Sequence, residues 1–219
     1  MQLVIGNKNY SSWSLRPWLL LTAGNVQFEE QWVSLQEPEL SKRLLQFSDS
    51  ARVPVLNDGD LTVWDSLAIC EYVNEVYLDN TALPEGASDR AIARSVVAEM
   101  HSGFSALRNE MPMNIRASRT IEASNQCLND IKRIDEIWSR YAREDEFGDL
   151  RLFGRFGLAD CMFAPVVMRF KTYQPALSKP ASAYMNSMQS HPALKKWIAD
   201  ALQETEVVTV DEAGADRES

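Results

Sequence analysis

The sequence predicts an α/β domain with the element order βαβαββα, followed by an all-α helical bundle. Three observations predict this division. Short apolar segments alternate with helical patterns over residues 1–79. Residues 80–87, Asn-Thr-Ala-Leu-Pro-Glu-Gly-Ala, have the polar, proline- and glycine-containing composition of a linker. Residues 88–205 carry only helical periodicity, and we expect residues 206–219 to be a mobile acidic tail.

Each element of the first domain has a local signal. The apolar patterns predict strands at residues 2–5, 28–35, 53–56 and 61–64. Helical spacing predicts helices at residues 14–23, 38–47 and 65–77. The segment Asn57-Asp58-Gly59-Asp60 between the last two strands has the chemistry of a hairpin turn. This order implies a mixed sheet with helices on its faces.

The second domain contains no pattern typical of a strand. Its predicted helices cover about residues 89–111, 121–141, 157–170, 181–189 and 192–204. The region is therefore expected to be a bundle of helices alone.

The composition excludes several classes of function. A net charge of −9 and no block of Lys or Arg argue against nucleic-acid binding and against anionic membranes. No run approaches the ~20 apolar residues of a membrane helix, and residues 1–5 lack the basic start of a signal peptide. We therefore expect a cytoplasmic protein. The three cysteines form no Cys-x-x-Cys pair, so we expect buried thiols and no metal site.

The turn before the first helix is rich in hydroxyl groups. Ser14 is expected to cap the helix, Pro17 lies in its first turn, and Ser11 and Ser12 remain as hydroxyl donors. The first N–H groups of a helix lack internal partners, so an anion placed there is stabilised. The alternative is that all three serines only satisfy backbone groups of the turn.

Two further positions suggest a peptide ligand. A cis Val53-Pro54 bond would turn the Val53 N–H and C=O outward to pair with an extended peptide, whereas a trans Pro54 would mark an edge strand. Asp65 and Ser66 at a helix start could hold an ammonium group and a carboxylate, or could form a simple N-cap. A ligand with both groups at one end is an amino acid or a γ-glutamyl peptide.

Four segments together resemble the cytosolic glutathione transferases with a serine at the active site, in particular zeta, maleylacetoacetate isomerase-like members. The segments are Ser11-Ser12-x-Ser14 with Arg16, Arg52-Val53-Pro54-Val55-Leu56, Asp65-Ser66-x-Ala68-Ile69 and Gly157-Leu158-Ala159-Asp160. The resemblance covers about residues 1–205 and implies a thioredoxin-like domain, a helical domain and a homodimer. It also implies glutathione as cosubstrate and a small-molecule electrophile as substrate.

The resemblance assigns roles to individual residues. Ser11 would hold the glutathione sulfur, with Ser12 as the fallback. The other implied contacts with glutathione come from Arg52, Val53, Pro54, Asp65 and Ser66. Asp160 is implied to be a folding residue. The chain departs from the family at Trp18, where a basic residue is common, and at Gly157, where serine or threonine is usual.

Five residues are candidates for lining the electrophile site. They are His101, Phe104, Arg108, Met111 and Arg116, and the alternative is that these residues serve interdomain or dimer packing. The predicted function is a glutathione transferase that activates the thiol for attack on an electrophile. The alternatives are a glutathione-dependent cis-trans isomerase, with Arg169 binding a substrate carboxylate, and a non-catalytic binding or regulatory protein with the same fold.

Overall fold

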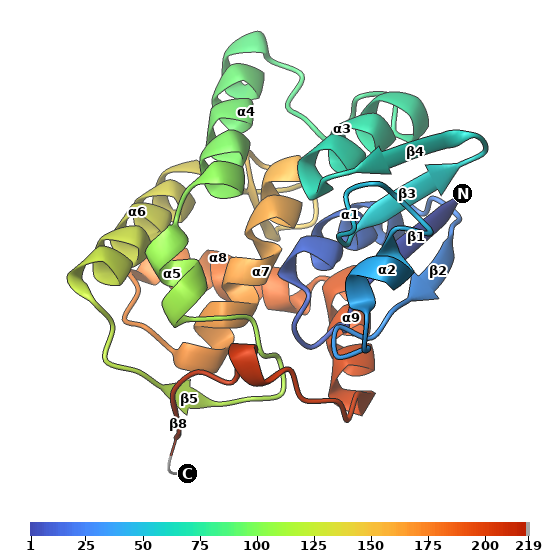
Figure 1. Cartoon of the computed structure of the whole chain (residues 1–219). Coiled ribbons are helices and arrows are strands. Elements are labelled where there is room, and N and C mark those ends of the chain that lie inside the picture. The colour runs from blue at the N-terminus through green and yellow to red at the C-terminus, as the bar shows by residue number, and fades with distance from the viewer. Residues whose placement is uncertain (218–219) are drawn as a thin grey trace.

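The computed structural model describes residues 1–217, which form an α/β half and a helical half (Figure 1). The sheet of the α/β half has the strand order β2-β1-β3-β4. Its strands are β1 (Gln2–Ile5), β2 (Glu29–Trp32), β3 (Val55–Asp58) and β4 (Leu61–Trp64). β1 pairs with β2 in parallel and with β3 antiparallel. β3 and β4 form the expected hairpin, but Asn57 and Asp58 of the predicted turn are paired residues of β3. The predicted mixed sheet is confirmed.

Alternate residues of the strands serve the two faces of the sheet. Leu3, Ile5 and Leu56 join the main core with α1 (Ser12–Ala23) and α3 (Ser66–Tyr77). On the opposite face, Val4 and Val55 pack with the short helix α2 (Leu40–Leu44). α2 covers less than the predicted residues 38–47, and it begins late because Glu39 adopts a left-handed conformation with φ of 59°.

The helical half is built around α7, almost all of whose residues are buried. Its helices are α4 (Ala87–Ser102), α5 (Ser105–Glu110), α6 (Asn125–Tyr141), α7 (Leu158–Tyr173), α8 (Lys179–Ser190) and α9 (Pro192–Gln203). The predicted continuous helix over residues 89–111 is wrong, because extended Gly103 and left-handed Phe104 separate α4 from α5. A Cβ atom at residue 103 would lie 2.7 Å from the Glu99 carbonyl oxygen.

The expectation of a second domain without strands is also wrong. Two small antiparallel pairs join β5 (Arg119–Thr120) to β8 (Ala215–Asp216) and β6 (Ala142–Glu144) to β7 (Leu150–Leu152). Strands of two or three residues are too short to create a visible alternation of apolar and polar residues.

The acidic C-terminal segment lies on the protein, contrary to the expected mobile tail. The 3₁₀ helix η1 (Thr209–Asp211) and β8 belong to this segment, and Val208 is buried. Glu212 accepts hydrogen bonds from Tyr10 and Asn114 and pairs with Arg119. Composition alone could not reveal these distant partners of the acidic side chains. Residues 218 and 219 of the predicted tail lie outside the described residues.

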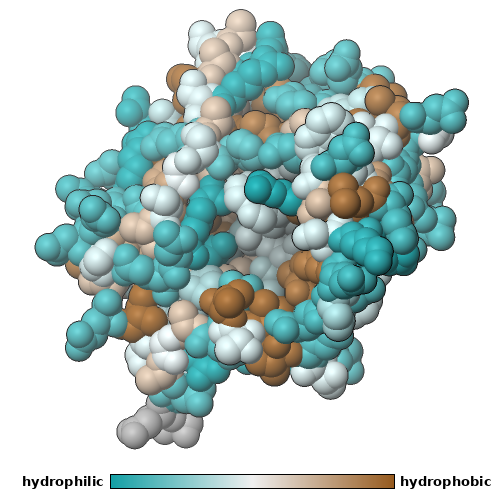
Figure 2. All heavy atoms as spheres, viewed as in Figure 1, coloured by the Kyte–Doolittle hydropathy of each residue, from teal (hydrophilic) through white to brown (hydrophobic). Residues whose placement is uncertain are grey.

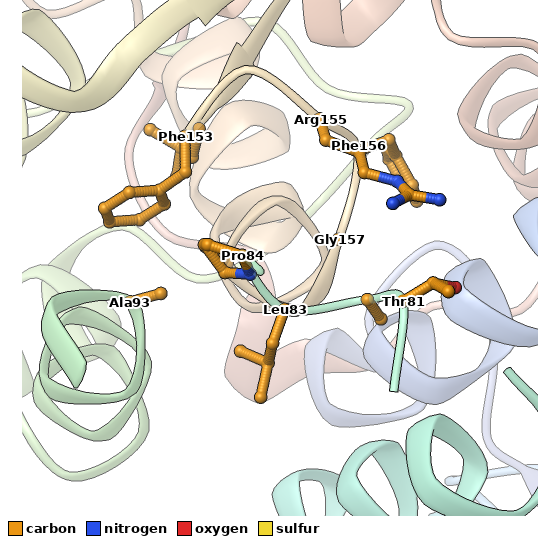
Figure 3. Close-up of a pocket in the computed structure, with 11 residues that line it drawn as sticks. Thr81, Leu83, Pro84, Ala93, Phe153, Arg155, Phe156 and Gly157 are labelled. Carbon is orange, nitrogen blue, oxygen red and sulfur yellow. The ribbon is translucent and has the colours of Figure 1, made fainter. Parts of the chain in front are cut away.

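The linker between the halves is tied to both of them. The Ala82 N–H donates to the Asn74 side chain of α3 at 2.9 Å, and the Ala82 carbonyl accepts from Leu158 of α7 at 2.9 Å. Figure 3 shows residues 81–84 beside the turn that carries Phe156 and Gly157. A Cβ atom at residue 157 would lie only 2.3 Å from the Ala82 oxygen, which explains glycine at this position.

The face shown in Figure 2 is hollowed between the two halves, and hydrophobic residues lie along the lower rim of the hollow. Within residues 1–217, no helix combines the length and apolar character needed to cross a bilayer. The division into residues 1–79, 80–87 and 88–205 remains a proposal.

Candidate functional site

The hydroxyl-rich turn leads directly into α1. Ser11 is the N-cap residue, and its hydroxyl donates to the Ser14 hydroxyl at 2.7 Å. Ser14 is not the cap, because the helix begins two residues earlier than predicted and the Ser14 hydroxyl accepts from the Gly6 N–H at 3.2 Å. Pro17 is therefore inside the helix and not in its first turn. The Ser11 hydroxyl lies at the positive end of α1, without a capping bond of its own.

Ser12 has a different partner. Its hydroxyl accepts from the Arg169 guanidinium of α7 at 3.3 Å. Arg169 is 6% exposed and also donates to the carbonyl groups of Arg108 and Met111. The two candidate sulfur ligands therefore differ in environment, since Ser11 contacts another hydroxyl and Ser12 contacts a cation.

A pocket of about 550 Å³ opens between the start of α3 and the end of α4. Its lining combines predicted glutathione-binding residues with three tryptophan or histidine rings and one further serine. The lining residues are Trp13, Ser50, Arg52, Val53, Pro54, Trp64, Asp65, Ser66 and His101. The Val53-Pro54 bond is cis, which is the alternative that the sequence analysis connected with a peptide ligand. In the described part of the chain, the Val53 N–H and C=O make no hydrogen bond.

Asp65 forms the N-cap, one of the two alternatives that the sequence left open, and its second carboxylate oxygen has a separate partner. Its Oδ1 caps α3 by accepting from the backbone N–H groups of Leu67 at 2.8 Å and Ala68 at 3.3 Å. Its Oδ2 lies 3.2 Å from Nε2 of His101. Asp65 has a φ of 74°, a conformation that costs about 1–3 kcal/mol for a residue other than glycine. One carboxylate oxygen therefore caps α3, and the other contacts His101 in the lining of the pocket.

His101, which the sequence analysis placed among the candidates for the electrophile site, lines the same pocket as Asp65. Its ring meets the edge of Trp13 with centroids 5.5 Å apart. Burial lowers the pKa of His101 most strongly, Arg16 and Arg108 lower it further, and Asp65 opposes them. The imidazole is therefore neutral near pH 7.

Arg16 is a buried cation beneath the pocket. Its side chain is 1% exposed, donates to the Ser66 hydroxyl at 3.3 Å and lies 4.4 Å from the Trp13 ring centroid. Burial, reinforced by Arg108, lowers the pKa of Arg16 to about 9, so the guanidinium stays charged at neutral pH. Arg108 and Arg169 both lower the pKa of Arg16, so three guanidinium groups lie near one another beside α1 and α7. The sequence showed Arg16 near the turn but not its burial.

The remaining candidates for the electrophile site do not line this pocket. Phe104 and Met111 are buried in the main core, and Arg108 lies 4.8 Å from the Trp13 ring centroid. Arg116 donates to the Tyr10 hydroxyl at 3.0 Å and to the carbonyl of Glu206 at 2.6 Å. The structure thus brings together the predicted residues for the glutamyl end of the ligand, but not those for an electrophile.

The chain is similar in sequence to known proteins. A probable maleylacetoacetate isomerase of Caenorhabditis elegans is 33% identical over 98 residues, covering 45% of this chain and 45% of that protein. The chain therefore matches about half the length of this relative. Glutathione S-transferase 1 of Dianthus caryophyllus is 27% identical over 175 residues, covering 77% of this chain and 76% of that protein.

Solved structures show the same fold. A glutathione transferase homolog from Burkholderia with bound glutathione has a TM-score of 0.70 at 21% identity, covering 91% of this chain and 97% of that one. A maleyl pyruvate isomerase, described as a bacterial zeta-class glutathione S-transferase, has a TM-score of 0.69 at 19% identity, covering 94% and 100%.

Two family models match the chain itself. The glutathione S-transferase N-terminal domain matches residues 10–76, and the glutathione S-transferase C-terminal domain matches residues 90–200. These two models cover most of the sequence. The protein therefore belongs to the glutathione S-transferase family.

Proposed function

We propose that this protein is a glutathione transferase that binds glutathione in the 550 Å³ pocket and activates its thiol for attack on a small electrophile. The observation that carries the proposal is the pocket lining, which combines the outward oxygen of Asp65, Ser66 and the unpaired Val53 backbone. Asp65 supplies a carboxylate for the γ-glutamyl ammonium group of glutathione. Ser66, with Arg16 beneath it, supplies hydrogen-bond donors for the γ-glutamyl carboxylate. Arg52 is available for the second carboxylate of the tripeptide.

Ser11 is the proposed donor to the glutathione sulfur. The Ser14 hydroxyl can reverse the bond that joins the two serines and donate to Ser11, which frees the Ser11 proton for the thiolate. A hydrogen bond to a charged group contributes about 1.5–3 kcal/mol, and one pKa unit corresponds to about 1.4 kcal/mol. Ser11 would therefore lower the thiol pKa by about one to two units from its ordinary value of ~8.5.

The test compares Ser11→Ala with the neighbouring variant Ser12→Ala. Glutathione binding is measured by calorimetry, and the thiolate is titrated by its ultraviolet absorbance. Ser11→Ala should keep the affinity and raise the pKa of the bound thiol by about one to two units. Ser12→Ala should change that pKa little. The reverse result would assign the sulfur to Ser12, and an unchanged pKa in both variants would overturn thiol activation by this turn.

Asp65 is tested separately with Asp65→Asn. Asparagine is also a good N-cap, so this variant removes the charge while keeping the start of α3. Loss of a charged hydrogen bond of about 1.5–3 kcal/mol should raise the glutathione Kd by about 10- to 100-fold. An unchanged Kd would contradict the γ-glutamyl assignment.

A glutathione-dependent cis-trans isomerase is the second candidate. It is favoured by the buried Arg169 guanidinium, which reaches Ser12 at 3.3 Å and could hold a substrate carboxylate beside the sulfur. Two chemistries are therefore assayed with glutathione: conjugation of a chromogenic aryl halide, and isomerisation of a cis-configured unsaturated dicarboxylic acid. Binding of glutathione without either activity would favour the non-catalytic alternative.

We also propose a cytoplasmic homodimer with a role in detoxification. Exposed Trp64, Val76, Tyr77 and Ile92 on β4, α3 and α4 support a subunit interface there. Light scattering should give a mass of about twice 24.8 kDa. A monomeric mass would overturn the proposed dimer.

A further inference from the structure

The C-terminal segment holds the loop that precedes Ser11. The Glu204 carboxylate accepts from two consecutive backbone N–H groups, those of Lys8 at 2.7 Å and Asn9 at 2.9 Å. Both residues are buried, so these donors depend on Glu204 for their hydrogen bonds. One side chain beyond α9 therefore fixes the path of the loop two residues before Ser11.

The same loop carries this constraint to Ser11. The Asn7 carbonyl accepts from the Ser11 N–H at 2.8 Å, and the Asn7 side chain donates to Glu206 at 2.9 Å. The hydroxyl of Tyr10, which directly precedes Ser11, donates to Glu212 at 2.5 Å. Three acidic residues of the C-terminal segment thus contact four consecutive residues of the loop, Asn7 to Tyr10.

Arg116 of the helical half binds the C-terminal segment. Its guanidinium donates to the carbonyl groups of Glu204 and Glu206 and to the Tyr10 hydroxyl. Its backbone N–H donates to the Asn9 side chain at 2.9 Å. Arg116 therefore joins the C-terminal segment and the loop at one point.

We infer that residues 204–212 form a positioning strap, which sets the place of the Ser11 hydroxyl for the glutathione sulfur, with Glu204 as its principal positioning residue. This inference rests on the proposed function of Ser11. Hydrogen bonding to a sulfur anion depends steeply on distance and angle, so a small shift of the loop weakens thiol activation. Glutathione affinity should change less, because Asp65 and Ser66 lie at the start of α3, whereas the acidic side chains of the strap bind the loop at residues 7–10.

The test uses the full-length variant Glu204→Gln, whose amide faces the two N–H groups with only one acceptor oxygen. The pKa of bound glutathione should rise by about one unit, so kcat below that pKa should fall about tenfold with little change in KM. Hydrogen exchange should become faster in residues 7–11. The matched control is Asp135→Asn, since the Asp135 carboxylate also holds a backbone N–H, that of Ser178 at 2.6 Å, but lies on α6. The control should retain the thiol pKa of the unmodified protein.

The outcomes separate the two proposals. If the unmodified protein neither binds glutathione nor lowers its thiol pKa, the proposed function fails, and the strap has no sulfur to position. If the unmodified protein does both and Glu204→Gln has the same thiol pKa and kcat, only the strap is overturned. If Glu204→Gln does not fold, Glu206→Gln replaces it, because Glu206 contacts Asn7 and Ser34 in the same region. An unchanged thiol pKa in that variant equally overturns the strap.

Discussion

Removal of the Asp160 carboxylate should destabilise the folded protein strongly. Asp160 is fully buried at the start of α7 and accepts three hydrogen bonds from different parts of the helical half. The donors are the N–H groups of Leu152 at 3.0 Å and Gly157 at 3.0 Å, and the Tyr184 hydroxyl at 2.9 Å. Asp160→Ala leaves all three donors without a partner. Each buried unsatisfied group costs about 1–3 kcal/mol, so the free energy of unfolding should fall by at least about 3 kcal/mol.

Urea denaturation followed by tryptophan fluorescence measures this loss. At an m-value of about 3 kcal/mol/M, the midpoint should fall by about 1 M or more. The measurement is made at pH 8, because burial raises the pKa of Asp160 to about 7 and the carboxylate must be ionised. Tyr184→Phe is the matched control: it removes one donor and should cost about 1 kcal/mol. A loss in Asp160→Ala no larger than that in Tyr184→Phe would refute the assignment of Asp160 as the centre of this network.

Two further predictions concern buried titratable groups. Burial, strengthened by Arg151, lowers the pKa of His191 from its ordinary 6.5 to about 4, so the unfolded chain binds a proton first as the pH falls. The stability that the neutral His191 gives the folded state is fully present above about pH 6.5 and is lost towards pH 4. After allowance for partial exposure, this loss amounts to about 2 kcal/mol. It should appear as a fall in the urea midpoint between pH 7 and pH 4.5. His191→Asn keeps an N-cap for α9 and should show a smaller fall, whereas an equal fall contradicts the prediction. All three cysteines are buried, and burial raises the pKa of Cys70 to about 12. A disulfide reagent should therefore modify no thiol of the native protein and three thiols after denaturation. Rapid labelling of the native protein would contradict this burial.

The sequence predicted the α/β half well because its signals are local. Alternating residues such as Leu3 and Val4 divide between the two faces of one strand, and that division is visible in the chain itself. The break at Gly103 and Phe104 was missed, because the turn depends on a close approach of the Glu99 carbonyl and not on a change in hydrophobic period.

The candidate site was predictable where backbone chemistry defines it. Pro54 interrupts an apolar strand pattern, and Asp65 stands at a helix start, so both positions were recognisable before the structure. The partners of these residues were not recognisable. His101 reaches Asp65 from α4, and Glu204 reaches the loop before Ser11 from beyond α9. Such long-range contacts depend on the packing of the two halves, which hydrophobic periodicity does not determine.

The joint at Ala82 has a consequence for how ligands reach the hollow between the halves. A hinge in this linker would have to break both backbone hydrogen bonds of Ala82, one to Asn74 and one to Leu158, and separate its carbonyl from the close contact at Gly157. These contacts therefore hold the two halves in a fixed relative position at the linker. A ligand that enters the pocket passes the side chains that line it, among them Trp13, Trp64 and His101, while the two halves keep their relative position.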